Sequence, residues 1–310
     1  MKEWNGKRYH TLNYFLREKF GEKVFKISLD GGFSCPNRDG KISSGGCTFC
    51  GANGAGDFAG DRCLSITKQF NDVREMMSHK WKSGKYIAYF QAYTNTYGPV
   101  EDLRKKYEEA ISQDGVVALA IATRPDCLDE EVLDLIEEIS KKLYVWVELG
   151  LQTSSDDSAK RINRGYLLNV YDEAVKKLKM RNIDTVTHVI FGLPGESRED
   201  MLNSIDYVVK SGVWGIKIHL LHLMKNTKLV EEYEAGTLKF LSQEEYIDLV
   251  TTSVSRLPEE MVIHRLTGDA PRDELIGPMW SLKKWEVLNA MDKAFEENKL
   301  YQGKNFTENL

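Results

Sequence analysis

The sequence predicts an α/β fold, an open partial barrel followed by a mostly helical C-terminal extension. Six short runs rich in β-branched and aromatic residues alternate with longer amphipathic stretches, and this alternation ends near Met224. Such an alternation predicts parallel βα units, whose active sites lie at the C-terminal ends of the strands. Six strands are too few to close an eight-stranded barrel. We therefore expect a partial (β/α)6 TIM-type barrel.

The expected strands are short apolar runs bounded by turn or polar residues. They are Lys23–Asp30, Lys85–Tyr93, Val116–Thr123, Tyr144–Gln152, Asp184–Gly192 and Trp214–Leu223. The helices expected between them have an apolar stripe at helical spacing. They are Ile66–Trp81, Val100–Ser112, Glu130–Lys141, Asn169–Arg181 and Glu199–Ser211. Ser197 with Asp200, and Ser242 with Glu245, have the spacing of capping boxes at helix starts.

Beyond the barrel, the pattern changes to two helices that flank one short strand-like run. The helices are expected at Gln243–Arg256 and Leu282–Asn298, and the strand at Met261–Leu266. No linker rich in Pro, Gly or Ser precedes them. We therefore expect residues 1–225 to form the barrel with an N-terminal helix, and residues 226–310 to pack on it as an extension.

Composition restricts the cellular setting and the classes of partner. Hydrophobic residues make up 42% of the 310 residues, charged residues make up 29%, and the net charge is −5. That charge argues against dominant non-specific nucleic-acid binding. The start of the chain lacks an apolar signal core, and runs such as Val116–Ala122 are too short to span a bilayer. We expect a cytoplasmic protein without a membrane association.

Three of the five cysteines lie in one glycine-rich loop after the first expected strand. The segment SCPNRDGKISSGGCTFC (Ser34–Cys50) contains Cys35, Cys47 and Cys50 but no fourth ligand. In a reducing compartment such a cluster indicates metal or redox chemistry. A structural zinc site needs four closed ligands, and Cys63 could complete one. Three thiolates on an iron–sulfur cubane instead leave one iron open, which explains the missing ligand.

Further motifs at strand ends carry a family resemblance. They are Cys47-Thr48-Phe49-Cys50, ELGLQT (Glu148–Thr153), INRGY (Ile162–Tyr166) and FGLPGES (Phe191–Ser197). Together they resemble the radical SAM superfamily, in the subgroup of Elongator-type and coproporphyrinogen dehydrogenase-like enzymes. With LDGGFSCPNRDG, AGDFAGDR, FQAYTNTY and HRLTGDAP, the chain resembles the YhcC/YtqA-type (MnmL-like) branch along nearly its whole length. The first cysteine gap, eleven residues instead of the usual three, departs from the superfamily pattern.

The resemblance implies a [4Fe–4S] cluster held by Cys35, Cys47 and Cys50, with S-adenosylmethionine (SAM) at the open iron. One-electron reduction, from a donor such as flavodoxin or ferredoxin, would yield a 5′-deoxyadenosyl radical that abstracts hydrogen from substrate. The radical is then the reactive species, so no side chain is assigned as catalytic. The protein would position the cofactor and exclude water.

The resemblance also implies the residues that contact SAM. Arg164 could fork onto the methionyl carboxylate or be a surface charge, and His188 could touch the ribose or be a satisfied core histidine. Phe49 could stack near the adenine or shield the cluster. The full set is Phe49, Ala92, Tyr93, Thr94, Gln152, Arg164, His188 and Gly192.

Other polar residues on the strands have open roles. Glu148 on a buried strand could bind a ribose or an amine, or pair with a lysine. His219 and His222 are out of phase on a strand, so we expect only one of them to point inward. We expect His264–Arg272 to be a lid or a substrate-side element.

The branch resemblance implies tRNA as substrate. The expected reaction trims the carboxymethylaminomethyl group at C5 of the wobble uridine to aminomethyl. Three basic segments could contact phosphates, although Lys-rich helix faces are usually only solvated; the segments are Arg104–Lys106, Lys176–Arg181 and Lys283–Lys284. The alternatives are a radical SAM enzyme acting on a small metabolite, such as a porphyrin precursor, and a non-catalytic metal-binding scaffold.

Overall fold

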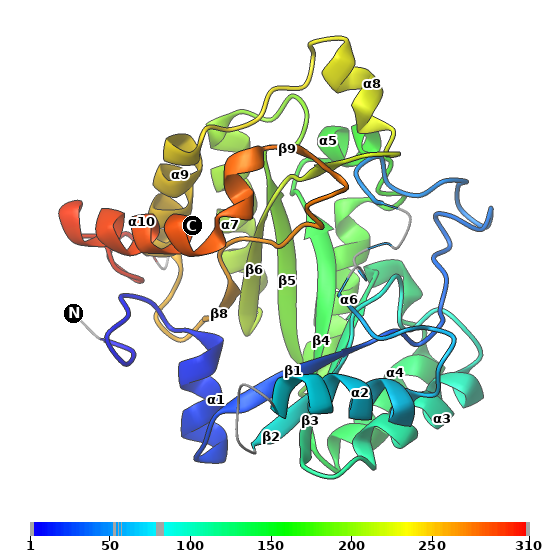
Figure 1. Ribbon diagram of the computed structural model, residues 1–310. Helices are drawn as coiled ribbons and strands as arrows, with labels where there is room; N and C mark the ends of the chain where they lie inside the picture. Colours follow the sequence, from blue (N-terminus) through cyan, green and yellow to red (C-terminus); the bar gives the residue numbers. More distant parts are fainter. Residues whose placement is uncertain (1–2, 52–53, 55, 57, 79–83, 308–310) are drawn as a thin grey trace.

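A curved, seven-stranded parallel sheet forms the centre of the molecule (Figure 1). The computed structural model describes residues 3–51, 54, 56, 58–78 and 84–307. The strand order is β1-β2-β3-β4-β5-β6-β8, and every neighbouring pair is parallel. The strands are β1 (Val24–Leu29), β2 (Lys85–Phe90), β3 (Val116–Thr123), β4 (Tyr144–Gln152), β5 (Asp184–Phe191), β6 (Gly215–Leu220) and β8 (Val262–Arg265). The predicted partial barrel is confirmed.

The seventh strand is a difference from the six-strand expectation. β8 comes from the segment assigned to the extension, yet it pairs with β6, with Gly215 opposite Val262. Ile263, also in β8, donates its backbone N–H to the His10 carbonyl at 2.8 Å, and this bond ties the N-terminal segment to the β8 edge of the sheet. The extension therefore supplies one strand of the barrel wall.

Helices cover the convex face of the sheet, and the main hydrophobic core lies between the two layers. The covering helices are α2 (Ile66–Ser78), α3 (Val100–Ile111), α4 (Glu130–Ser140), α6 (Leu168–Met180) and α7 (Arg198–Ser211), with the short α5 (Asp156–Arg161) and η1 (Pro125–Cys127) in the connections. Residues 79–81 of the first expected helix lie outside the described residues. The capping box at Ser197 is present as predicted, as is the one at Ser242.

The concave face of the sheet is apolar at one end and polar at the other. At the N-terminal end of the strands, α1 (Leu12–Phe20) buries Leu12 and Leu16 against Val24 and Trp146. The Thr11 side chain caps α1 by accepting the Tyr14 N–H at 3.1 Å. This apolar layer covers the N-terminal end of the concave face, whereas the polar side chains lie towards the carboxyl ends of the strands.

The rest of the chain packs beside the barrel mouth. These elements are β7 (Leu223–Met224), α8 (Leu229–Glu234), α9 (Gln243–Arg256), β9 (Leu275–Gly277), η2 (Met279–Leu282) and α10 (Lys284–Glu297). α10 packs on α9, α9 packs on α7, and β7 pairs with β9 in an antiparallel ribbon. Within the described residues, no helix is both long and apolar enough to cross a membrane.

Candidate active site

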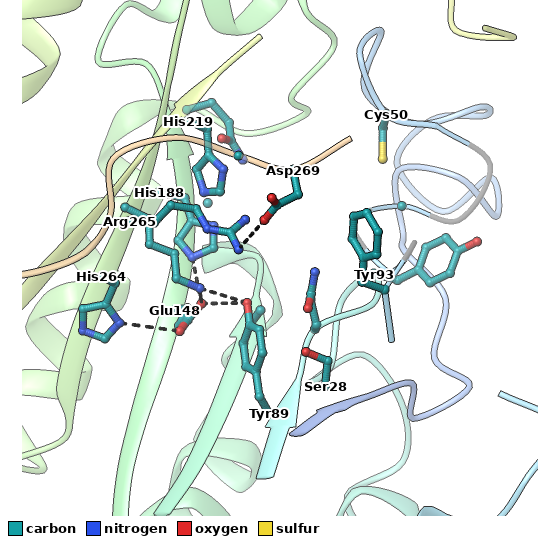
Figure 2. Close-up of a pocket in the computed structure, with 18 of the residues that line it drawn as sticks. Ser28, Cys50, Tyr89, Tyr93, Glu148, His188, His219, His264, Arg265 and Asp269 are labelled. Atoms are coloured by element: carbon teal, nitrogen blue, oxygen red, sulfur yellow. Dashed lines mark hydrogen bonds and ion pairs between the residues drawn. The ribbon is translucent and has the colours of Figure 1, made fainter. Parts of the chain in front are cut away.

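A cavity of about 940 Å³ opens at the carboxyl ends of the strands. The cysteine loop lines one end, and charged side chains from β4, β5, β6 and β8 line the other (Figure 2). This is the position at which barrel enzymes place their chemistry. Residues 55 and 57 of the AGDFAGDR motif lie outside the described residues.

The three loop cysteines, Cys35, Cys47 and Cys50, all line the cavity, as the sequence led us to expect for metal ligands. The loop is fastened to the segment after α5: Asn163 donates to the Gly46 carbonyl at 2.8 Å, and Asn37 donates to the Asn163 carbonyl at 2.6 Å. Gly45 and Gly46 both have positive φ angles, 85° and 81°, which side chains at these positions would oppose. Glycine thus permits the tight return of the loop.

Donor groups lie beside the thiols, while burial opposes ionisation of Cys47. Asn37 Nδ2 lies 3.6 Å from Cys47 Sγ. The Arg38 guanidinium lies near Cys50 and Cys35. Burial lowers the pKa of Arg38, but these two cysteines raise it, and the net effect is a raised pKa. Burial, together with the neighbouring Cys50, raises the pKa of the Cys47 thiol to about 12. A bound metal would offset this cost, since coordination keeps a thiol deprotonated. The three cysteines thus share one cavity and have donor groups beside them of the kind that thiolate ligands need.

The zinc alternative receives no support from Cys63. Its side chain is exposed, and it does not belong to the cavity lining. Among the described residues, no three His, Cys, Asp or Glu side chains are gathered closely enough to hold a metal ion, and this includes Cys35, Cys47 and Cys50 as they stand in this structure. The ligand roles of the three loop cysteines remain a proposal.

Two of the predicted SAM contacts have strained backbone. Tyr93 and Gln152 have φ angles of 58° and 68°, in the left-handed region that non-glycine residues seldom adopt. Gln152 follows an irregularity in the pairing of β4 with β5. The Tyr93 ring has the Arg38 and Arg62 guanidiniums 5.5 and 5.4 Å from its centre. Such strain is typical of functional sites.

The other predicted SAM contacts divide into two groups. Phe49 and Thr94 line the cavity, and Phe49 also packs against the apolar cluster around Leu221. Ala92 and Gly192 do not belong to the lining. Gly192 donates its N–H to the Met201 sulfur at 3.1 Å, and the side chains of Leu221 and Leu241 are its neighbours on the side that a methyl group would occupy. Any contact of Ala92 or Gly192 with a ligand remains a proposal.

Arg164 is fully buried, and its guanidinium binds the backbone around the end of β4. It donates to the carbonyls of Leu151 at 2.6 Å and Thr153 at 2.7 Å, and to that of Tyr166 at 3.1 Å. Asp156 lies 3.4 Å away. These contacts exclude the surface-charge reading and leave the proposed carboxylate contact to experiment.

We expect Arg164→Lys to lower the free energy of unfolding by about 3 kcal/mol, because an ammonium cannot replace a buried guanidinium that serves three carbonyls. Chemical denaturation of the purified variant measures this. Arg161→Lys is the control, since Arg161 is exposed and pairs with Glu232 at the surface. A variant that unfolds like the wild type but binds SAM weakly would instead assign the guanidinium to the cofactor.

Glu148 is the centre of a buried polar layer on the concave face of the sheet. Its carboxylate accepts hydrogen bonds from Lys217, from Tyr89 at 2.9 Å and from Trp146 at 3.0 Å. Lys26 lies 3.6 Å away. Burial alone would raise the pKa of the Glu148 carboxyl, but Lys217 and Lys26 hold that pKa well below its usual value. Of the two readings of Glu148, the lysine pairing is the one observed.

Histidines complete this layer. His188 Nε2 lies 2.9 Å from the Glu148 carboxylate, and burial lowers the pKa of its imidazole to about 4. His188 lines the cavity and also has a hydrogen-bond partner in Glu148, so a contact with the ribose and a role as a hydrogen-bonded core histidine are compatible. The expectation for His219 and His222 was wrong: both line the cavity. β6 ends at Leu220, so strand alternation no longer applies at His222.

Several site residues were missed by the sequence reasoning. They are Lys26, Tyr89, Arg124 and Lys217. A signal was available for the lysines, because each interrupts an otherwise apolar strand, as Glu148 does. Arg124, which forms a two-pronged pair with Asp126 at 2.9 and 2.7 Å, follows β3 with no comparable signal.

Comparison with known families identifies this architecture. A model described as "Radical SAM superfamily" matches residues 39–208, and one described as "Radical_SAM C-terminal domain" matches residues 213–297. The chain belongs to the radical SAM superfamily. Membership implies a [4Fe–4S] cluster and SAM. The first match includes Cys47 and Cys50 and begins four residues after Cys35, which is consistent with the unusual first gap.

Individual relatives agree with this assignment. The chain is 54% identical to YtqA of Bacillus subtilis over 97% of its length and 93% of that protein. It is 38% identical to YhcC of Escherichia coli over 91% of each chain. Among solved structures, Elp3 of the archaeon Methanocaldococcus infernus has a TM-score of 0.69 at 18% identity, covering 90% of this chain and 64% of that one. The structural likeness shows a shared fold, and the radical SAM assignment rests on the sequence matches.

Proposed function

We propose that this chain is a radical SAM enzyme that trims the carboxymethylaminomethyl group at C5 of the wobble uridine of tRNA to aminomethyl. The observation that carries the proposal is the two-ended cavity, with three cysteines at one end and a cationic, polar layer at the other. The cluster and SAM, when bound, would supply hydrogen abstraction by a 5′-deoxyadenosyl radical. Cys35, Cys47 and Cys50 would hold the cluster.

The tRNA part of the proposal is supported by the names of distant relatives. A tRNA uridine(34) acetyltransferase of Methanocaldococcus infernus is 26% identical over 52% of this chain. A tRNA-2-methylthio-N(6)-dimethylallyladenosine synthase of Fusobacterium nucleatum is 25% identical over 54%. Enzymes with related sequences therefore act on tRNA, one of them on uridine 34. The wobble uridine is our inference for this chain.

The basic segments first considered for phosphate contact are largely engaged elsewhere. Arg104 pairs with Glu138 at 2.7 Å, and Arg181 pairs with Glu130 at 2.7 Å. Lys284 pairs with Asp269 at 2.6 Å. Such solvated pairs are the usual state of charged helix faces. Arg38 and Tyr93, which line the cavity, are better placed to meet a nucleotide, and the Arg62 guanidinium lies 5.4 Å from the centre of the Tyr93 ring.

Deleting the gene should cause carboxymethylaminomethyl wobble uridine to accumulate in tRNA at the expense of aminomethyl derivatives. Nucleoside profiling by mass spectrometry measures this, with the wild-type gene and a Cys50→Ala gene returned separately as controls. Only the wild-type gene should restore the profile. An unchanged tRNA profile with an altered porphyrin pool would replace the tRNA substrate by a small metabolite.

A further inference from the structure

The charged end of the cavity has more cations than anions. Lys26, Lys217, Arg265 and Lys284 line it, against the two carboxylates of Glu148 and Asp269. Glu148 is shared by Lys26 and Lys217, and these three side chains are 0–25% exposed. Burying a cation in excess of its anions is costly. Accordingly, burial lowers the pKa of Lys26, and burial with the nearby Lys26 and Arg265 lowers that of Lys217 to about 7; an anionic ligand at this end would favour the protonated form of both lysines.

Unused hydrogen-bonding groups point to the same place. The Nε2 atoms of His219 and His222 are buried and have no hydrogen-bond partner within the described part of the chain, and both rings line the cavity. Gly268 lies against both rings: a methyl group added there would be 3.3 Å from His222 and 3.8 Å from His219. The atoms that this methyl group would meet are Cε1 and Nδ1 of His222 and Nδ1 of His219, so Gly268 packs against the Nδ1 side of the rings and not against Nε2. A neutral imidazole can donate one N–H to an acceptor.

The guanidinium of Arg265 is the group that can select a carboxylate among anions. Its guanidinium is 3.3 Å from Asp269, which Lys284 also contacts at 2.6 Å. If Arg265 binds a ligand instead of Asp269, Lys284 therefore still pairs with Asp269. A guanidinium binds a carboxylate with two parallel hydrogen bonds. In Figure 2, Arg265, His219 and Glu148 lie together, across the cavity from Cys50.

We propose that Arg265, His219 and Lys217 form a subsite for the carboxylate of the substrate. The inference rests on the proposed function, whose substrate ends in a carboxylate that the aminomethyl product lacks. A carboxylate held here would direct the adjacent carbon towards the cysteine end, where hydrogen would be abstracted. Trimming removes the whole carboxymethyl group: loss of a hydrogen atom and of one further electron at this carbon, with the cluster as electron acceptor, followed by hydrolysis of the C–N bond, would release glyoxylate and leave the aminomethyl amine. The product would then lack the carboxylate that this subsite holds, which would weaken its binding and favour release.

The test compares two nucleosides, 5-carboxymethyl-aminomethyluridine and 5-aminomethyluridine, by anaerobic calorimetry on the cluster-loaded protein. We expect the first to bind at least about tenfold more tightly, the difference expected from a charge-assisted pair. Arg265→Gln should abolish that preference, and Arg265→Lys should restore part of it. Arg256→Gln is the matched control, because Arg256 pairs with Asp206 at 2.8 Å outside the cavity, and it should keep the preference.

Three results would overturn the inference. They are equal binding of the two nucleosides by the wild type, equally effective competition by inorganic phosphate, and an Arg265→Gln variant whose SAM affinity falls as much as its nucleoside affinity. The last would assign the subsite to the methionyl carboxylate. Failure of the proposed function has a different signature: an unchanged tRNA profile in the deletion strain, whatever the calorimetry shows. A carboxylate preference that depends on Arg265 would then still establish the subsite.

Discussion

Replacing Cys35, Cys47 or Cys50 singly with alanine will abolish reductive cleavage of SAM and remove the cluster of about four irons that we expect the reconstituted protein to hold. All three cysteines line one cavity, and Asn37 and Arg38 lie beside the sulfurs, which supports the proposal that the three thiolates hold the cluster. A cluster with only two protein ligands is poorly held. Iron and sulfide analysis, with spectroscopy before and after SAM addition, measures the loss.

Cys63→Ala is the matched control for the cysteine variants. Cys63 is exposed and lies off the cavity, so this variant should retain the iron content and the spectral response to SAM. A wild-type protein that holds one zinc ion, and loses it in Cys63→Ala, would contradict the cluster assignment. That outcome would make the loop a closed structural site.

Glu148→Gln should lower the free energy of unfolding by about 3–5 kcal/mol, the cost of removing one partner of a buried ion pair. The substitution leaves Lys217 and Lys26 buried without a carboxylate, while the size of the side chain is unchanged. Denaturant unfolding at pH 7 measures the effect.

The double variant Glu148→Gln with Lys217→Met tests the cause of this loss. Because it removes the excess cation as well, it should recover part of the stability that Glu148→Gln loses. A single variant as stable as the wild type, or a double variant that loses the two effects additively, would show that Glu148 and Lys217 are not energetically coupled.

The fold followed from local patterns because each βα unit shows its own periodicity. Short apolar runs and helical stripes predicted six strands and the covering helices within a few residues. Ser197 and Ser242 cap their helices as their spacing predicted. β8 was recognised as a strand but placed in the extension, because partner choice depends on contacts between distant segments. Its pairing with β6 has no local signal.

The candidate site divides in the same way. Spacing and residue type were enough to select Cys35, Cys47, Cys50 and Gln152, which line one cavity. They could not decide the role of Arg164, whose guanidinium is directed to backbone carbonyls by the way the chain turns after β4. Nor could they place His222, since its direction depends on where β6 ends.

By itself, the sequence determined the fold class, the cysteine loop and the superfamily, because each of these depends on patterns or motifs within short contiguous segments. The tertiary structure alone decided which charges meet. Lys26, Glu148, Lys217 and Arg265 come from four strands, and parallel register with a common curvature turns them towards one point. Burial then strengthens the electrostatic interactions between these side chains, since water no longer screens their charges. The ratio of cations to anions at this point cannot be read from any single segment of the sequence, because the charged residues come from separate strands.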